Sequence, residues 1–212
     1  MIIGEGSIDS SRTSFGLYAR IGEFVRKALA SGISANEILK AMQEGMIEVG
    51  KKYEEGEYFL SELMAAGEIF KTTMEELTPY LSKTKTVSVG TVVMGTVQGD
   101  LHDIGKNIFK TLLQSAGFTV LDLGVDVSPE RFVDEVRKSN VDIVAMSSLL
   151  TTTMDQMRLM IDALKKAGLR NKVKIIVGGN PITAEFGKEI GADAAVRDAV
   201  AGATLCREWV NE

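Results

Sequence analysis

The stretch TVSVGTVVMGTVQGDLHDIGKN, residues 86–107, decides the fold, because a strand-like apolar run ends in a polar, glycine-rich loop that leads into a helix. Four more strand-like runs follow, at 118–123, 141–146, 173–177 and, more weakly, 194–196. A helical pattern follows each run. Strands that alternate with helices predict a parallel sheet covered by helices on both faces.

The helix starts support this reading. Ser128-Pro129 and Asn180-Pro181 each place a capping residue before a proline, so we expect helices to begin there. The pattern as a whole predicts an α/β fold, a Rossmann or flavodoxin-like, doubly wound sheet of five parallel strands. In such sheets ligands bind beyond the carboxyl ends of the strands, at the switch point of the topology.

The first part of the chain has a different period. Apolar residues recur at helical spacing from about residue 14 to 81, and Ser34 with Glu37 forms a capping box at the start of the second helix. Gly56 interrupts the pattern before the third helix. We therefore predict an all-α helical bundle domain at residues 1–82, a polar linker at 81–86, and the α/β domain at 83–212.

Composition excludes several classes of protein. The chain has 212 residues and a net charge of -5. This charge arises in residues 1–82, which hold 13 acidic and 8 basic side chains, whereas the rest of the chain holds 16 of each. An excess of acidic groups argues against a nucleic-acid partner. We see no membrane-spanning run and no signal peptide, so we expect a cytoplasmic protein without a membrane partner. Cys206 is the single cysteine, which excludes a multi-cysteine metal site.

The only histidine, His102, lies in the loop Gly99-Asp100-Leu101-His102-Asp103-Ile104-Gly105, directly after the first predicted strand. It can be read as a surface histidine beside a helix cap. It can also be read as a metal ligand oriented by a nearby carboxylate. A lone histidine suits a metal that arrives with most of its coordination already filled, as in a tetrapyrrole-like cofactor.

Three spaced motifs favour the second reading. Asp100-x-His102-x-x-Gly105 is followed after 41 residues by Ser147-x-Leu149 and after 28 more by Gly178-Gly179. This pattern resembles the cobalamin-binding domain shared by methionine synthase, the carbon-skeleton mutases and the corrinoid proteins of methanogen and acetogen methyltransferase systems. Residues 45–50 and 55–60 resemble the helical cap of methionine synthase and of the small corrinoid proteins.

The resemblance implies a cobalamin or related corrinoid bound with its dimethylbenzimidazole tail displaced. His102 would be the axial ligand of cobalt, while Asp100 and the hydroxyl of Thr153 would tune that ligand. The rest of the motif loop, namely Gly99, Leu101, Asp103, Ile104 and Gly105, would contact the cofactor. Ser147, Leu149, Thr151, Gly178, Gly179 and Ala199 would surround the tail. Phe59 and Leu63 of the cap would shield the upper face, although core packing of the bundle explains most apolar residues there.

The sequence departs from the family pattern at three positions. The family commonly has a small apolar residue at the position of Asn180, a tyrosine at Ala195 and a proline at Ser61. The final loop and the start of the third helix are the regions that these departures affect.

The resemblance also implies a function. The chain would be a non-catalytic methyl carrier between a substrate-specific methyltransferase and a second methyltransferase with a thiol or tetrahydrofolate acceptor. A reductive activase would be its third partner. The alternative is a cobalamin-binding sensor. Such sensors carry a basic DNA-binding segment, whereas this N-terminal half is acidic. A small mutase subunit would lack the helical cap. The methyl donor and the oligomeric state cannot be read from the chain.

Overall fold

The computed structural model describes residues 10–81 and 88–211. It begins with three helices, α1 (Ser10–Ala30), α2 (Ala35–Glu54) and α3 (Leu60–Leu81). The capping box predicted at Ser34 is confirmed, since the Ser34 hydroxyl accepts from the Glu37 N–H and the Glu37 carboxylate accepts from the Ser34 N–H. Gly56, at a φ of 76°, lies in the turn between α2 and α3.

The second part is the predicted α/β fold. Its strands are β1 (Thr91–Thr96), β2 (Thr119–Asp122), β3 (Ile143–Ser147), β4 (Lys174–Gly178) and β5 (Ala194–Val196). They form one parallel sheet in the order β2-β1-β3-β4-β5. The intervening helices are α4 (Ile104–Ser115), α5 (Pro129–Lys138), α6 (Met154–Lys166), α7 (Ala184–Ile190) and α8 (Ala199–Asn211). Two short 3-10 turns, Thr151–Thr153 and Arg170–Lys172, complete the fold.

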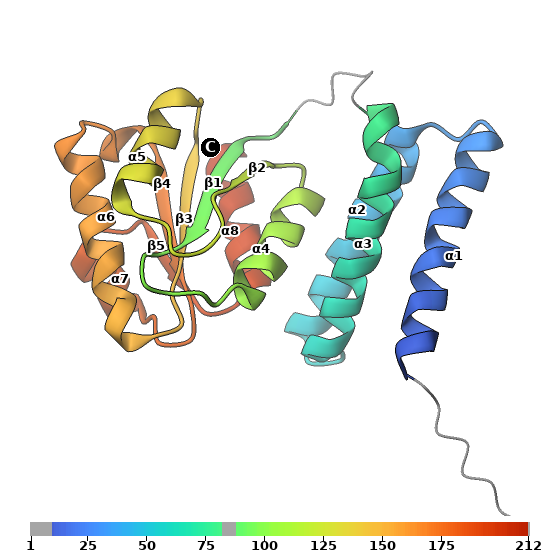
Figure 1. The fold of residues 1–212 in the computed structure, drawn as a ribbon, viewed down its shortest axis with the longest axis horizontal. Coiled ribbons are helices and arrows are strands. Elements are labelled where there is room, and N and C mark those ends of the chain that lie inside the picture. Colours follow the sequence, from blue (N-terminus) through green and yellow to red (C-terminus); the bar gives the residue numbers. More distant parts are fainter. Residues whose placement is uncertain (1–9, 82–87, 212) are drawn as a thin grey trace, which may run out of the picture.

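Alternate side chains of each strand face different layers. Val92 and Met94 pack with α4 and α8, whereas Val93 packs with α5 and α6 on the other face. Both faces of the sheet are therefore covered, and the central residues of β1, β3 and β4 are apolar and buried. In Figure 1, α5, α6 and α7 lie on one side of the sheet and α4 and α8 on the other.

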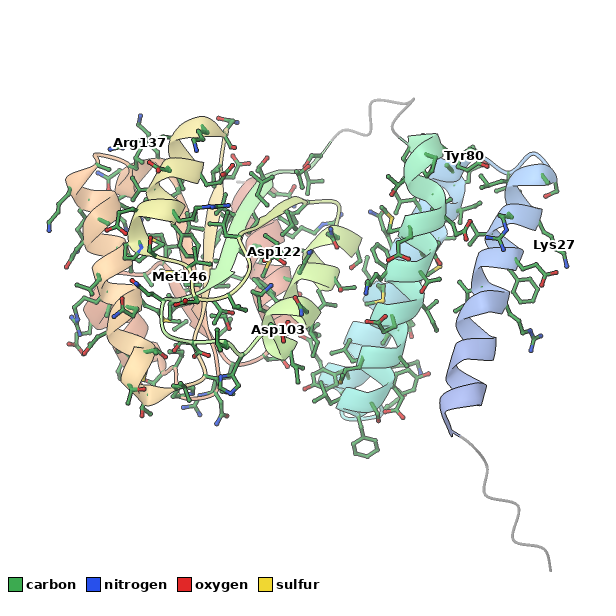
Figure 2. All side chains as sticks on the ribbon, in the orientation of Figure 1. Lys27, Tyr80, Asp103, Asp122, Arg137 and Met146 are labelled. Carbon is green, nitrogen blue, oxygen red and sulfur yellow. The ribbon has the colours of Figure 1, made fainter. Side chains whose placement is uncertain are left out.

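The helical bundle packs against α4 and α8, and one apolar core continues from the bundle into the sheet. Contacts are close where the bundle has glycine: a Cβ built on Gly50 would lie 3.1 Å from Val200, and one on Gly67 would lie 3.6 Å from Thr111. Helices α2 and α3 thus form a layer beside α4, and α1 is outermost (Figure 1). In Figure 2, Lys27 lies on this outer helix and Tyr80 near the end of α3.

Two details differ from the sequence-based expectation. The first strand was expected at 86–94 but spans Thr91–Thr96. The helix expected at Asn180-Pro181 begins instead at Ala184, because Thr183 is its N-cap and Pro181 lies in a turn. The predicted boundary between residues 82 and 83 lies outside the described residues, and it stays a prediction. None of the described helices is long and apolar enough to cross a membrane.

Candidate corrinoid site

The loop after β1 holds Asp100 at the centre of the site. The Asp100 side chain is fully buried, with an exposed fraction of 0%. Gly99, at a φ of 81°, turns the chain, and its N–H donates to the carboxylate of Asp126. The Thr96 hydroxyl donates to the His102 carbonyl at 2.9 Å, which ties the loop back to the end of β1.

The Asp100 carboxylate is held by N–H groups on both oxygens. Oδ1 accepts from the His102 backbone N–H at 3.0 Å and lies 2.7 Å from the imidazole Nδ1 of His102. Oδ2 accepts from the N–H groups of Leu149 at 2.7 Å and Leu150 at 3.2 Å. Burial alone raises the pKa of Asp100, but these hydrogen bonds outweigh it and hold that pKa well below the ordinary value.

This geometry decides which nitrogen of His102 is available. Because Asp100 is ionised, it can only accept, so Nδ1 carries the proton that it shares with Oδ1. The lone pair is then on Nε2, which is the nitrogen that can ligate a metal. The His102 side chain is half exposed, at 51%, so the imidazole has a buried edge on Asp100 and an accessible one.

Two buried hydroxyls complete the surroundings of Asp100. Thr153 Oγ1, the hydroxyl expected to tune the ligand, lies 3.2 Å from Asp100 Oδ2, and Ser148 Oγ lies 3.4 Å from the same oxygen. The methyl group of Thr153 packs over Gly99, where a Cβ would be 3.3 Å away. Ser148 was not predicted, because it occupies the unspecified position between Ser147 and Leu149, and nothing in the sequence distinguishes it.

Beside this group lies a cavity of about 440 Å³ at the carboxyl ends of β1, β3 and β4. It lies at the switch point, because the chain passes from β1 to β2 on one side and then to β3 on the other. Most of its walls are apolar, including Met94, Phe109 and Ile176. The predicted residues that line it are Leu101, His102, Asp103, Ile104, Gly105, Ser147, Leu149, Gly178, Gly179 and Ala199.

Other predicted residues lie elsewhere. Gly99, Asp100 and Thr153 lie outside the cavity lining, with Asp100 and Thr153 buried beside it, and Thr151 is exposed in the 3-10 turn after β3. In the cap, Phe59 is 72% exposed, whereas Leu63 is 3% exposed and belongs to the bundle core. The structure thus assembles the three motifs around one cavity but does not bring the two cap residues to it.

A buried ion pair also borders the cavity. Lys106 is buried in the first turn of α4, and its ammonium donates to both carboxylate oxygens of Asp122 at 2.8 and 2.9 Å. Lys110 donates to the same carboxylate at 3.0 Å. Figure 2 shows Asp122 on the strand beside α4, and Asp103 at the start of that helix. These contacts join the helix that follows the His102 loop to β2.

The residues present fit a corrinoid. A single nitrogen donor, fixed by an ionised carboxylate, suits a metal whose equatorial ligands come from a macrocycle. Among the described residues, no group of three or more His, Cys, Asp or Glu side chains could hold a metal ion. A Cβ built on Gly105 meets no atom within 4 Å, so there is open space over the first turn of α4.

Comparison with known proteins agrees with this geometry. Two family models, each described as a B12 binding domain, match residues 90–204 and 16–78. Trimethylamine corrinoid protein 1 of Methanosarcina acetivorans is 44% identical over 174 residues, which cover 81% of this chain and 81% of that protein.

Two solved structures are also similar. A cobalamin-binding protein from Desulfitobacterium hafniense DCB-2 has 41% identity and a TM-score of 0.71, covering 96% of this chain and 99% of that one. A chain of the methanol:cobalamin methyltransferase complex MtaBC from Methanosarcina barkeri has 27% identity and a TM-score of 0.80, covering 92% of this chain and 74% of that one. The chain therefore belongs to the B12-binding corrinoid proteins that combine a helical cap with an α/β cobalamin-binding domain.

Proposed function

We propose that this chain is the methyl carrier of a corrinoid-dependent methyltransferase system and is not itself an enzyme. It would receive a methyl group from a substrate:corrinoid methyltransferase and present it to a second methyltransferase with a thiol or tetrahydrofolate acceptor. The observation that carries the proposal is the His102–Asp100 pair at 2.7 Å beside the switch-point cavity, in a chain 44% identical to a trimethylamine corrinoid protein. That relative favours a methylamine, trimethylamine first, as the methyl donor.

His102 would hold the cofactor by binding its cobalt through Nε2, with the dimethylbenzimidazole tail displaced. When bound, the corrinoid supplies a cobalt centre that can accept a methyl group and release it again. Asp100 keeps the proton of His102 on Nδ1, which leaves the Nε2 lone pair free for the metal. Because the ionised Asp100 carboxylate is buried, it also makes the imidazole a stronger electron-pair donor to a metal.

The displaced tail would enter the cavity beside His102. Apolar walls such as Phe109 and Ile176 suit an aromatic base, and the glycine pair at the end of β4 allows the backbone to come close to it. Ser147 and Ala199, from the ends of β3 and the start of α8, would contact the tail from two sides. Leu149 lines the same cavity and supplies an N–H to Asp100, so it would serve both parts of the site.

The upper face would be shielded by the cap. Phe59 is a candidate because its ring is exposed at the start of α3. Leu63 is buried in the bundle core, so any contact it makes with the corrin would require the cap to move from its position on α4. Such movement would also admit the two methyltransferases and the reductive activase, all of which we place with this protein in the cytoplasm.

The proposal is tested on protein reconstituted with hydroxocobalamin and reduced to the paramagnetic divalent state. His102 is the only histidine, so labelling histidine with ¹⁵N should change the nitrogen splitting of the electron paramagnetic resonance signal from a triplet to a doublet. In the labelled protein, the substitution His102→Ala should remove the doublet. If neither the label nor the substitution altered the spectrum, His102 would not be the ligand.

The function itself is tested with purified methyltransferases. We expect methyl transfer to the reconstituted chain from trimethylamine in the presence of a trimethylamine:corrinoid methyltransferase. Transfer only with a dimethylamine, monomethylamine or methanol enzyme would correct the donor, and transfer with none of them would refute the carrier function.

A further inference from the structure

Ser148 and Thr153 place two buried hydroxyl groups at the same oxygen of Asp100. Their oxygen atoms are 2.8 Å apart, and either one can be the donor in this contact. Ser148 is completely buried and Thr153 nearly so. A buried hydroxyl pair this close to a carboxylate must distribute its protons among few acceptors, so the possible arrangements can be counted.

Two hydroxyl protons face two outer acceptors, Asp100 Oδ2 and the carbonyl oxygen of Leu150. Each hydroxyl reaches both: Thr153 Oγ1 at 3.2 and 3.0 Å, and Ser148 Oγ at 3.4 and 3.2 Å. Whichever hydroxyl turns toward Leu150 or toward its neighbour, the other can still donate to Asp100. The carboxylate therefore keeps an O–H donor in either arrangement.

The backbone fixes Ser148 at this place. Its N–H donates to the Gly178 carbonyl at 3.0 Å, which joins the end of β3 to the end of β4. A Cβ built on Gly179 would lie only 1.9 Å from the Ser148 carbonyl oxygen, and Gly179 has a φ of 138°. Only glycine permits this approach. The second glycine of the motif thus positions the Ser148 segment, besides lining the cavity.

We propose that Ser148 is a positioning residue of the corrinoid site: with Thr153 it forms a hydroxyl pair that keeps an O–H donor on Asp100, and it acts on His102 through that carboxylate. This inference rests on the proposed role of His102 as the cobalt ligand. The pair shares a single task, so loss of one hydroxyl is compensated by the other and loss of both is not.

The test uses the protein without cofactor, in which ¹⁵N-labelled histidine gives the signals of a single imidazole. The Nδ1–H proton shift reports the strength of its hydrogen bond to Asp100. Withdrawal of the hydroxyl donors leaves Oδ2 less satisfied, which makes the carboxylate a stronger acceptor for Nδ1–H. We expect Ser148→Ala and Thr153→Val each to shift this proton slightly downfield, and the double variant to shift it by more than the sum of both.

Controls separate this effect from general damage. Thr152→Val removes an exposed hydroxyl from the same 3-10 turn and should leave the signal in place. Ser148→Ala/Thr153→Ser restores one hydroxyl and should return the signal close to that of Ser148→Ala alone. If the double variant failed to fold, the rescue variant would still give a readout. Its Nδ1–H signal should match that of Ser148→Ala, and a clearly larger downfield shift would contradict the inference.

The inference is overturned if Thr153→Val alone reproduces the full shift of the double variant, since Ser148 then contributes nothing. It is also overturned if the double variant leaves the Nδ1–H signal unchanged. Failure of the proposed function would look different. In that case the Nδ1–H signal would still depend on the two hydroxyls, but the ¹⁵N label would not alter the cobalt spectrum of the reconstituted protein.

Discussion

Alanine at position 179 should destabilise the α/β domain strongly. The added Cβ would lie 1.9 Å from the Ser148 carbonyl oxygen, whereas ordinary contact begins at 3.4 Å, so the two segments must separate by about 1.5 Å. That movement would pull apart the ends of β3 and β4. Overpacking of this kind costs about 1–3 kcal/mol, and a side chain at positive φ costs about 1 kcal/mol more. We therefore expect the free energy of unfolding to fall by about 3 kcal/mol.

The measurement is urea unfolding followed by fluorescence of Trp209, the only tryptophan, which is partly buried and packs against the core. Gly168→Ala is the matched control, because Gly168 also has positive φ, 69°, but a Cβ there meets no atom within 4 Å. It should cost only the backbone penalty, about 1 kcal/mol. Equal losses for Gly179→Ala and Gly168→Ala would refute the argument from close approach.

Four further predictions concern other parts of the α/β domain. Asp122→Ala leaves the Lys106 ammonium buried without its main partner, so urea unfolding should show a loss of about 3–5 kcal/mol, and a loss below 1 kcal/mol would contradict the importance of the pair. Burial raises the pKa of Asp122, but the hydrogen bonds from Lys106, Gly124 and Lys110 together outweigh burial, and the net pKa is lowered. The stability that Asp122 contributes is thus present above its ordinary pKa of 3.8 and lost as the pH falls below it, so an Asp122→Asn variant should lose less stability on acidification than the wild type. Gly105→Ala should fold normally but bind hydroxocobalamin weakly in a spectroscopic titration, because its Cβ enters the open space beside His102; unchanged binding would contradict that position of the corrin. Burial raises the pKa of Cys206 to about 12, so a thiol reagent at neutral pH should label it only in urea, and rapid labelling of the folded protein would contradict its burial.

The sequence was sufficient for the order of elements and for the motif loop, since both depend on local patterns. It ended the first strand too early, before Gly95 and Thr96, because glycine usually weakens a strand. In the structure they pair with Met146 and Ser147 of β3, and a Cβ on Gly95 would lie 3.0 Å from Phe132. Glycine is needed there for the close packing of a helix, and this requirement comes from a residue 37 positions away.

The site could be predicted only as far as its motifs reached. The resemblance of the spaced motifs to cobalamin-binding domains implies roles for Asp100, His102 and the glycine pair, and alignment through Ser147 implies one for Thr153. The role of Ser148 depends on hydroxyl positions that only the folded chain defines. The ion pair of Lys106 likewise joins residues from α4 and β2 whose contact depends on the crossover between them.

Helix α4 lies between the cap and the loop that carries His102. Its first residue, Ile104, follows the His102 loop and lines both the cavity beside His102 and a second cavity against α3. Further along, Thr111 contacts Gly67 of the cap. The 12 residues of α4 span about 18 Å. The contact at Thr111 lies seven residues, or about 10 Å, from Ile104, so a rotation of about 5° about this contact would shift the start of α4 by about 0.9 Å and strain the ion pair between Lys106 and Asp122.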